Sequence, residues 1–429
     1  MNETGANKPK RKKTGQKALW SWSFYDWANQ SYATVIQTFV FAAYFTNQVA
    51  TDTERATTHW SLTIGLTGLC VALSGPFLGA IADRAGRRKP WIGVNTLVCA
   101  IATAGLWLVH PRPDDYWLAL GLLAMATFGI QTATIFYNAM LGDLASRREY
   151  GLWSGRGWAM GYVGGIGCLV AVLVLFVREG ALLPLDREAA AHIRAAFPFV
   201  SLWLVVFSLP LFLFAPDRQA SERRWRESIR EGLSQLRDSL RNVRQYKGVV
   251  RFLIAWAFCT DGLATVFALG GVYAAGTFGM DETQILLFGI GLSLTAGAGA
   301  FGFSWVDERL GSRRTVLLGL VGLFVFSTLI LLVTDPYWFW IYGLLLGIFV
   351  GPVQASSRSY LSHAAPEELR GQLFGVFALA GKSTSFLGPL LVGGITAVSQ
   401  SQRIGLSIIP VYFVVGWFIL RGVPEVSSR

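Results

Sequence analysis

The chain has 429 residues, of which 53% are hydrophobic and 15% charged, and its formal net charge is +11. A soluble domain usually carries about 25% charged residues, whereas the charges here are concentrated between apolar stretches of roughly 20 residues. The composition therefore excludes an ordinary soluble protein. It also excludes a β-barrel, whose strands alternate over about 10 residues.

Apolar spans long enough to cross a hydrocarbon core of about 30 Å as helices follow one another along the whole chain. The twelve spans cover residues 20–48, 60–82, 90–110, 116–141, 152–178, 196–215, 250–277, 283–305, 315–333, 337–361, 372–398 and 404–421. Counted together with the basic residues at the ends of the spans, segments on the side of the N-terminus hold 28 Lys and Arg, against 6 on the other side. The positive-inside rule then predicts a plasma-membrane protein with both termini in the cytoplasm. This topology explains the net charge without a nucleic-acid partner.

The predicted fold is an all-α membrane protein with twelve transmembrane helices in two pseudo-symmetric six-helix halves. Its expected parts are a basic cytoplasmic tail at 1–19, an N-terminal half at 20–215, a linker at 216–250, a C-terminal half at 251–421 and a tail at 422–429. In the linker, apolar residues at helical spacing alternate with arginines. This pattern predicts an amphipathic helix on anionic inner-leaflet lipids, and a solvated linker is the alternative.

The segment between the second and third spans contains ordered glycines and charges. It reads Gly79-Ala-Ile-Ala-Asp83-Arg84-Ala-Gly86-Arg87-Arg88-Lys89, which resembles the cytoplasmic GxxxDRxGRR signature of the major facilitator superfamily. A degraded copy around Asp307 follows the eighth span. We expect the glycines to serve close helix packing and the charges to form part of a cytoplasmic gate. An ordinary positive-inside loop would explain the arginines but not the spacing.

A narrower resemblance begins in the first span, at Tyr25-Asp-Trp-Ala-Asn-Gln-Ser-Tyr-Ala-Thr34. Together with Asp261-Gly262 and Gln354-Ala-Ser-Ser-Arg358-Ser, it is similar to the "unknown major facilitator" family, which includes autophagy-related vacuolar effluxers. The resemblance implies a transporter, and by analogy with the vacuolar members an exporter of amino acids.

Two charges lie near the membrane midplane, and an ionisable side chain there is a functional candidate. At about 1.5 Å per residue, Asp261 is about 16 Å and Lys382 about 15 Å from the cytoplasmic ends of their spans. We expect this pair to frame a site for a zwitterionic solute, with Asp261 able to bind a coupling proton. The alternative is a static ion pair between two spans.

A second set of charges lies about 5–9 Å from the cytoplasmic ends. We expect Asp26 to form a gating pair with Arg156 or Arg358, with substrate binding as the alternative. Asn138 and Asp143, near the end of the fourth span, complete the predicted gate. The polar residues predicted to line the cavity are Asn29, Gln37, Gln131 and Gln354.

Glycines are concentrated in the fifth, eighth and eleventh spans, where Gly161, Gly165 and Gly388 are examples. Small residues allow helices to approach closely in a membrane. We interpret these glycines as a sliding interface between the halves, and static packing explains them almost as well.

Enzyme signals are absent from the sequence. It contains no GxxxxGK[ST] phosphate loop, its four histidines are scattered, and its four cysteines fall inside apolar spans. We expect a monomeric secondary transporter without a cofactor, which moves a small polar or zwitterionic solute and uses protons as the candidate coupling ion. A lipid or lysolipid flippase on the same scaffold and a transport-inactive receptor or scaffold are the alternatives.

Overall fold

A computed structural model describes residues 15–85, 87–145, 150–217, 245–364, 373, 376–377, 379–381 and 384–425, with side chains left out at 75–85, 142, 150–152, 154 and 362. The described chain is almost entirely helical. It contains nine helices that are long and apolar enough to cross a membrane. The protein is therefore an all-α, polytopic integral membrane protein.

The first helical rod is interrupted by two π-helical segments. It runs through α1 (Gln16–Ser31), η1 (Tyr32–Phe39), α2 (Val40–Tyr44) and η2 (Phe45–Val49). In η1 the hydroxyl of Thr38 donates to the carbonyl of Ala33, five residues back, at 2.8 Å. Such π segments occur frequently at functional sites, and the sequence pattern of this span does not reveal them.

The remaining helices before residue 217 complete a first group, which we call the N-group. They are α3 (Thr53–Ala85), α4 (Lys89–Gly105), η3 (Leu106–Leu108), η4 (Pro113–Asp115), α5 (Tyr116–Leu144), α6 (Tyr150–Val172), η5 (Leu173–Val177), α7 (Ala191–Arg194) and α8 (Ala196–Phe214). Within the N-group, α1 packs on α6 and α8, and α5 packs on α3 and α4.

The helices after residue 245 form the C-group. They are α10 (Lys247–Phe278), α11 (Glu282–Leu310), α12 (Ser312–Leu332), α13 (Pro336–Ala364), α15 (Leu387–Ser399), α16 (Gln402–Leu406) and α17 (Ile408–Arg421). Here α13 packs on α11 and α12, and α17 packs on α10 and α12.

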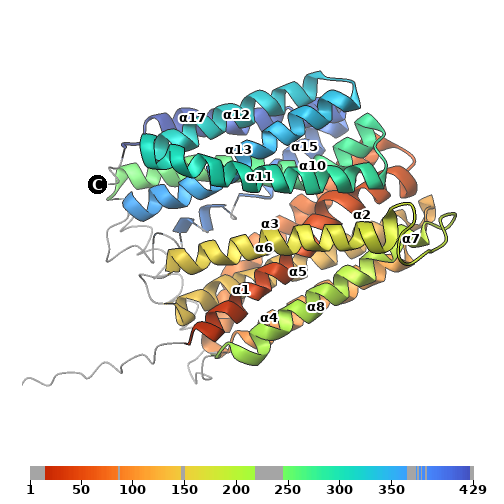
Figure 1. The fold of residues 1–429 in the computed structure, drawn as a ribbon, viewed down its shortest axis with the longest axis horizontal. Coiled ribbons are helices and arrows are strands. Elements are labelled where there is room, and N and C mark those ends of the chain that lie inside the picture. The colour runs from red at the N-terminus through yellow and green to blue at the C-terminus, as the bar shows by residue number, and fades with distance from the viewer. Residues whose placement is uncertain are drawn as a thin grey trace, which may run out of the picture.

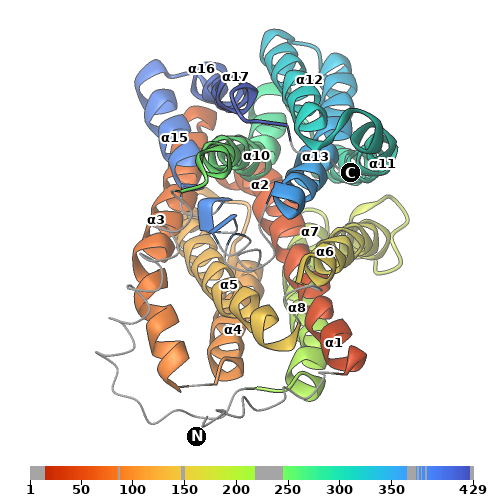
Figure 2. The ribbon, with the colours of Figure 1, turned by 90° about the vertical axis from the view of Figure 1, so that its left-hand side faces the viewer.

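The two groups lie side by side with their long helices nearly parallel (Figures 1 and 2). They meet where α15 packs on α3, where α10 packs on η1, α2 and α3, and where α11 packs on α6. We call the end with residues 15 and 425 the terminal end and the end with η2 and α7 the far end (Figure 1).

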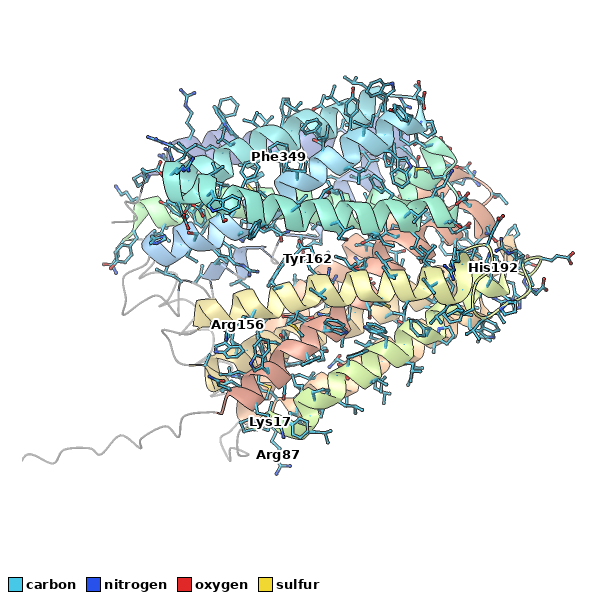
Figure 3. All side chains as sticks on the ribbon, viewed as in Figure 1. Lys17, Arg87, Arg156, Tyr162, His192 and Phe349 are labelled. Atoms are coloured by element: carbon cyan, nitrogen blue, oxygen red, sulfur yellow. The ribbon has the colours of Figure 1, made fainter. Side chains whose placement is uncertain are left out.

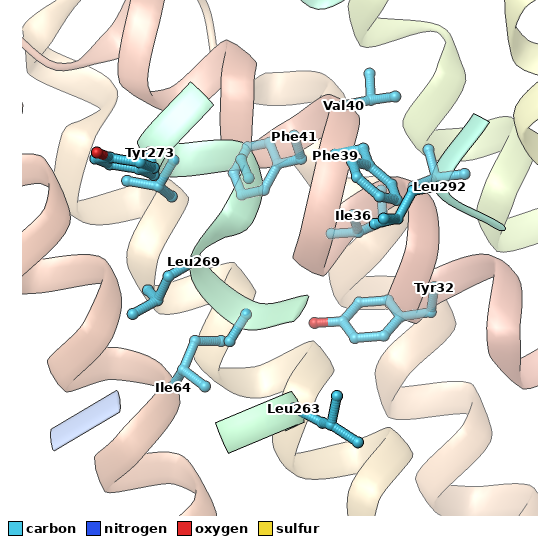
Figure 4. Packing of buried hydrophobic residues seen from close by; sticks show 14 of the residues in the cluster. Tyr32, Ile36, Phe39, Val40, Phe41, Ile64, Leu263, Leu269, Tyr273 and Leu292 are labelled. Atoms are coloured by element: carbon cyan, nitrogen blue, oxygen red, sulfur yellow. The ribbon is translucent and has the colours of Figure 1, made fainter. Parts of the chain in front are cut away.

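Apolar side chains from both groups form the central core. Figure 4 shows Phe39 of η1 beside Leu292 of α11, with Leu269 of α10 nearby. Many large apolar residues on the outer faces stay exposed, Phe301 and Val398 among them, as expected where the surrounding solvent is lipid.

Nine of the predicted spans coincide with the nine apolar helices. The other three, 20–48, 60–82 and 372–398, fall on the first rod, on α3 and on α15 with the few described residues before it. Most of the predicted tail at 1–19 and of the predicted linker helix at 216–250 lies outside the described residues, as do Gly86 and Lys382.

Candidate functional site

The loop before α4 is held by charges within the N-group. The Arg88 guanidinium forms a 2.7 Å ion pair with Asp143 at the end of α5, and both side chains are largely buried. The Asp217 carboxylate accepts the backbone N–H groups of Arg88 at 2.9 Å and Lys89 at 3.2 Å. A carboxylate at a helix N-terminus satisfies free N–H groups and favours the helix dipole. Two residues predicted for the gate therefore form one polar clamp.

The C-group contains a related clamp. Arg313 at the start of α12 donates to Glu425 at 3.2 Å and to the carbonyl of Arg421 at 2.6 Å. Gly311 adopts φ +87°, which only glycine reaches without strain, and so makes the chain reversal. In both groups an acidic residue after the last helix binds the start of the third long helix, which is α4 in the N-group and α12 in the C-group. Asp307 itself lies half-buried at the end of α11.

The rest of the predicted signature is only partly visible. Gly79, Asp83 and Arg84 lie in the last turns of α3, where side chains are not described, and Arg87 is exposed at the terminal end (Figure 3). Their predicted gating role stays a prediction.

Arg156 and Arg358 occupy different surroundings. The Arg156 guanidinium lies over the rings of Trp153 at 4.6 Å and Trp20 at 5.5 Å, and the side chain is exposed. Arg358 is half-buried and interacts electrostatically with Asp26. Of the two partners expected for Asp26, Arg358 is therefore the one whose charge acts on it.

Two pairs of side chains connect α6 of the N-group to α13 of the C-group. The Arg358 guanidinium lies 4.5 Å from the ring centre of Trp158. One helical turn further, the Tyr162 hydroxyl donates to Gln354 Oε1 at 3.1 Å, and Figure 3 shows Tyr162 between the two groups. We call these four residues the cross-group ladder. Asp26 adjoins it and accepts a 2.8 Å hydrogen bond from the Tyr137 hydroxyl.

Asp261 lies halfway along α10 and is 3% exposed. Its carboxylate accepts a hydrogen bond from the Thr384 hydroxyl at 3.0 Å. A Cβ atom on Gly388 would overlap the hydroxyl of Thr265, one turn beyond Asp261, so α15 approaches α10 closely here. The carboxyl is thus enclosed within the C-group. Because Lys382 lies outside the described residues, the predicted ion pair stays a prediction.

The other polar residues predicted to line the cavity, and Asn138, are half-buried on α1, η1 and α5. The Asn29 amide donates to the Thr134 hydroxyl of α5 at 3.2 Å. Gln37 lies in η1, while Gln131 and Asn138 lie on α5. Asn29 therefore ties two helices of one group.

The glycines of α6 pack inside the N-group. A Cβ atom on Gly161 would contact the backbone of Asp26, and one on Gly165 would lie 2.8 Å from Thr34 Oγ1. Gly388 packs on α10 in the same way within the C-group. Their surroundings match the static-packing alternative and not the sliding interface between halves. The glycines that face the other group are different ones, including Gly65, Gly271 and Gly289.

Hydrogen bonds between the two groups are concentrated at the far end, and no pattern in the sequence predicts them. Trp60 Nε1 donates to the Ala268 carbonyl at 3.0 Å, and Gln48 donates to Glu282 at 2.7 Å. The Gln402 side chain joins the hydroxyls of Thr57 and Thr277, and Asn47 donates to the Met280 carbonyl at 2.9 Å. We call this set the far-end closure. The described bonds at the terminal end, in contrast, stay within one group.

Beside the far-end closure, Arg112 donates to both carboxylate oxygens of Asp115, at 3.1 and 3.2 Å. These hydrogen bonds raise the pKa of Arg112 above its ordinary value. Among the described residues, no three side chains of the kinds that bind metal ions gather in one place.

Comparisons with known families agree with this architecture. A family model described as "Vacuole effluxer Atg22 like" matches residues 152–429, and one described as "MFS/sugar transport protein" matches residues 11–153. The chain is 26% identical over 413 residues to the uncharacterised MFS-type transporter YxiO of Bacillus subtilis, covering 95% of each chain. It is 25% identical over 363 residues to autophagy-related protein 22 of Kluyveromyces lactis, covering 76% of this chain and 70% of the relative.

Solved structures share the fold at low sequence identity. One is a bacterial homologue of the human lysosomal transporter Spinster, crystallised in an inward-facing, unoccupied conformation. It superposes with a TM-score of 0.71 at 14% identity, covering 99% of this chain and all of that one. A D-xylose–proton symporter gives a TM-score of 0.69 at 12% identity, covering 96% and 99%. Both likenesses show the major facilitator fold.

Proposed function

The chain belongs to the Atg22-like vacuole effluxer family of major facilitator transporters, and from this premise we propose that it carries a small zwitterionic solute by alternating access, coupled to protons. Members of this superfamily are transporters and not enzymes. The nature of the solute, the coupling ion and the direction of transport are the finer parts of this proposal.

The observation that carries the proposal is the unequal distribution of contacts between the two groups. Hydrogen bonds join the groups at the far end and halfway along, through the far-end closure and the Tyr162–Gln354 bond. A transporter that alternates needs such contacts to be breakable, and a few hydrogen bonds of about 1 kcal/mol each meet that need.

The predicted topology indicates which end of the described state faces the cytoplasm. With both termini in the cytoplasm, the closed far end faces outward and the described state corresponds to an inward-facing one. We further propose that the protein lies in a plasma membrane and exports its solute.

Asp261 is the proposed proton-coupling residue, because it is an enclosed carboxyl near the midplane. Changing Asp261 to Asn is expected to abolish solute accumulation driven by a pH gradient while leaving solute exchange within about threefold. The amide keeps the shape and can still accept the Thr384 hydrogen bond, but it cannot bind and release a proton. Uptake into proteoliposomes with an imposed pH gradient measures the difference.

The exposed Asp114, changed to Asn, supplies the matched control and should accumulate solute as wild type does. Accumulation by Asp261→Asn that matches this control would exclude Asp261 as the coupling residue.

Counterflow in proteoliposomes tests the function itself. The purified protein is reconstituted into proteoliposomes that contain an unlabelled amino acid, sugar or nucleoside. Entry of the same compound in labelled form is then followed. We expect amino acids to exchange and neutral sugars and nucleosides to exchange at the protein-free rate. Exchange of neutral solutes alone would contradict the proposed substrate class.

A further inference from the structure

We propose that Arg358 binds the carboxylate of the solute and that Asp26 binds its amino group, so that the solute site lies between the two groups at the cross-group ladder. This inference rests on the proposed transport function and names the residues that hold the two charged groups of the proposed zwitterionic solute. It replaces the gating role that the sequence indicated for both residues.

The first support is the state of the Arg358 guanidinium. The residue lies about 9 Å from the end of α13, inside the bundle. Its Cζ atom lies over the ring of Trp158, 4.5 Å from the ring centre. Among the described residues no oxygen accepts a hydrogen bond from it. A half-buried guanidinium whose five donors meet no acceptor among the described residues is well placed to receive a planar carboxylate.

The contact with Trp158 also limits where the guanidinium can lie. Its N–H groups that face away from the ring can bind a carboxylate with two parallel hydrogen bonds. The bond between Tyr162 and Gln354, one turn away, holds α6 and α13 at this spacing. The guanidinium is thus positioned before the solute arrives.

Asp26 supplies the opposite charge from the other group. It lies on α1, and a Cβ atom built on Gly157, the residue before Trp158, would overlap its Oδ2 atom. Its charge therefore lies beside the part of α6 that contacts Arg358. The Tyr137 hydroxyl donates to its Oδ2 atom at 2.8 Å and so orients the carboxylate. A carboxylate has about four acceptor positions, so it can bind several donors at once. A zwitterion between Arg358 and Asp26 would bridge the C-group and the N-group.

Asp261 is less suited to this role. It is 3% exposed and bonded to Thr384 of its own group, so a solute held there would not link the two groups. Binding that shifts a two-state equilibrium must contact the two states differently. A solute between α1 and α13 meets that condition because these helices belong to different groups.

Substrate selectivity in counterflow tests the inference. The probes are the amino acid that wild type exchanges fastest, its carboxamide and the corresponding carboxylic acid without the amino group. Wild type should show a KM for the carboxamide at least 100-fold above that for the amino acid, because the amide leaves Arg358 without an anionic partner. In Arg358→Gln the KM for the amino acid should rise at least tenfold and the ratio should fall below about 5.

The matched control is Arg421→Gln, since the Arg421 guanidinium also lies over a tryptophan, Trp417, at 5.5 Å but at the end of α17. It should keep the wild-type ratio. Asp26→Asn gives an independent arm: it should lose at least tenfold of the discrimination against the acid without an amino group.

A lower maximal rate with unchanged selectivity ratios in Arg358→Gln and Asp26→Asn would show a gating pair and overturn the inference while leaving the proposed function intact. A wild-type protein that exchanges only uncharged solutes overturns the proposed function and the inference together. Thermal unfolding in detergent checks that each variant is folded. Should Arg358→Gln unfold, the uncharged Arg358→Met replaces it, and an unchanged carboxamide ratio there likewise overturns the inference.

Discussion

Replacing Gly271 with alanine is expected to lower the transport rate by about 30- to 150-fold. Gly271 lies on α10 where that helix crosses η1, and a Cβ atom built on it would overlap the carbonyl oxygen of Thr38. Because the obstacle is backbone, no side chain can turn away to make room. The two helices must separate, and the far end then closes less well.

The size of the expected decrease in transport rate follows from the free-energy cost of overpacking. An added methyl group in a packed contact costs about 1–3 kcal/mol, and a backbone obstacle places this site in the upper part of that range. A shift of about 2–3 kcal/mol against the far-end-closed state corresponds to a population change of about 30- to 150-fold. Counterflow rates at saturating solute measure it.

The neighbouring glycine supplies the control. Gly270 has no atom within 4 Å of its hypothetical Cβ, so Gly270→Ala should transport at the wild-type rate and unfold at the same or a higher temperature, since alanine favours helix. Equal rates for Gly270→Ala and Gly271→Ala would show that the approach of α10 to η1 is not needed for transport.

Breaking the clamp of the N-group is expected to lower the free energy of unfolding by about 3 kcal/mol. The change is Asp143→Ala, which leaves the Arg88 guanidinium buried without its 2.7 Å partner. The Arg88 side chain is only 8% exposed and that of Asp143 only 16%, so little solvent screens the pair. Chemical unfolding in mixed detergent micelles measures the loss.

A double variant distinguishes an unpaired charge from a general loss of packing. Arg88→Met combined with Asp143→Leu removes both charges and should recover most of the stability, because apolar replacements of buried ion pairs are often neutral. The exposed Glu179, changed to Ala, should have no effect. A loss below about 0.5 kcal/mol in Asp143→Ala would mean that the clamp does not hold α4 to α5.

The fold could be predicted largely from the sequence, because span length, loop charge and the Asp83–Arg88 segment depend only on local composition and spacing. The π segments of the first rod could not be. They depend on how η1 fits against α10, and the identity of Thr38 alone contains no sign of the displaced hydrogen bond to Ala33.

The positions of Asp261, Asp26 and Arg358 along their spans could be predicted because they depend only on counting residues. Which of these charges face the other group could not be predicted in that way. Helical spacing shows that the glycines of α6 share a face, yet only the packed structure shows that this face meets α1. The far-end closure was missed because Trp60 and Gln402 resemble ordinary residues near the membrane surface.

The two ends are expected to open reciprocally, and paired distances between spin labels measure this. With the four native cysteines replaced, labels are placed at exposed Thr51 and Thr334 for the far end and at exposed Gln16 and Glu308 for the terminal end. Addition of the exchanged amino acid should lengthen the first distance and shorten the second. Two distances that stay unchanged, or that move in the same direction, would contradict alternating access between these groups.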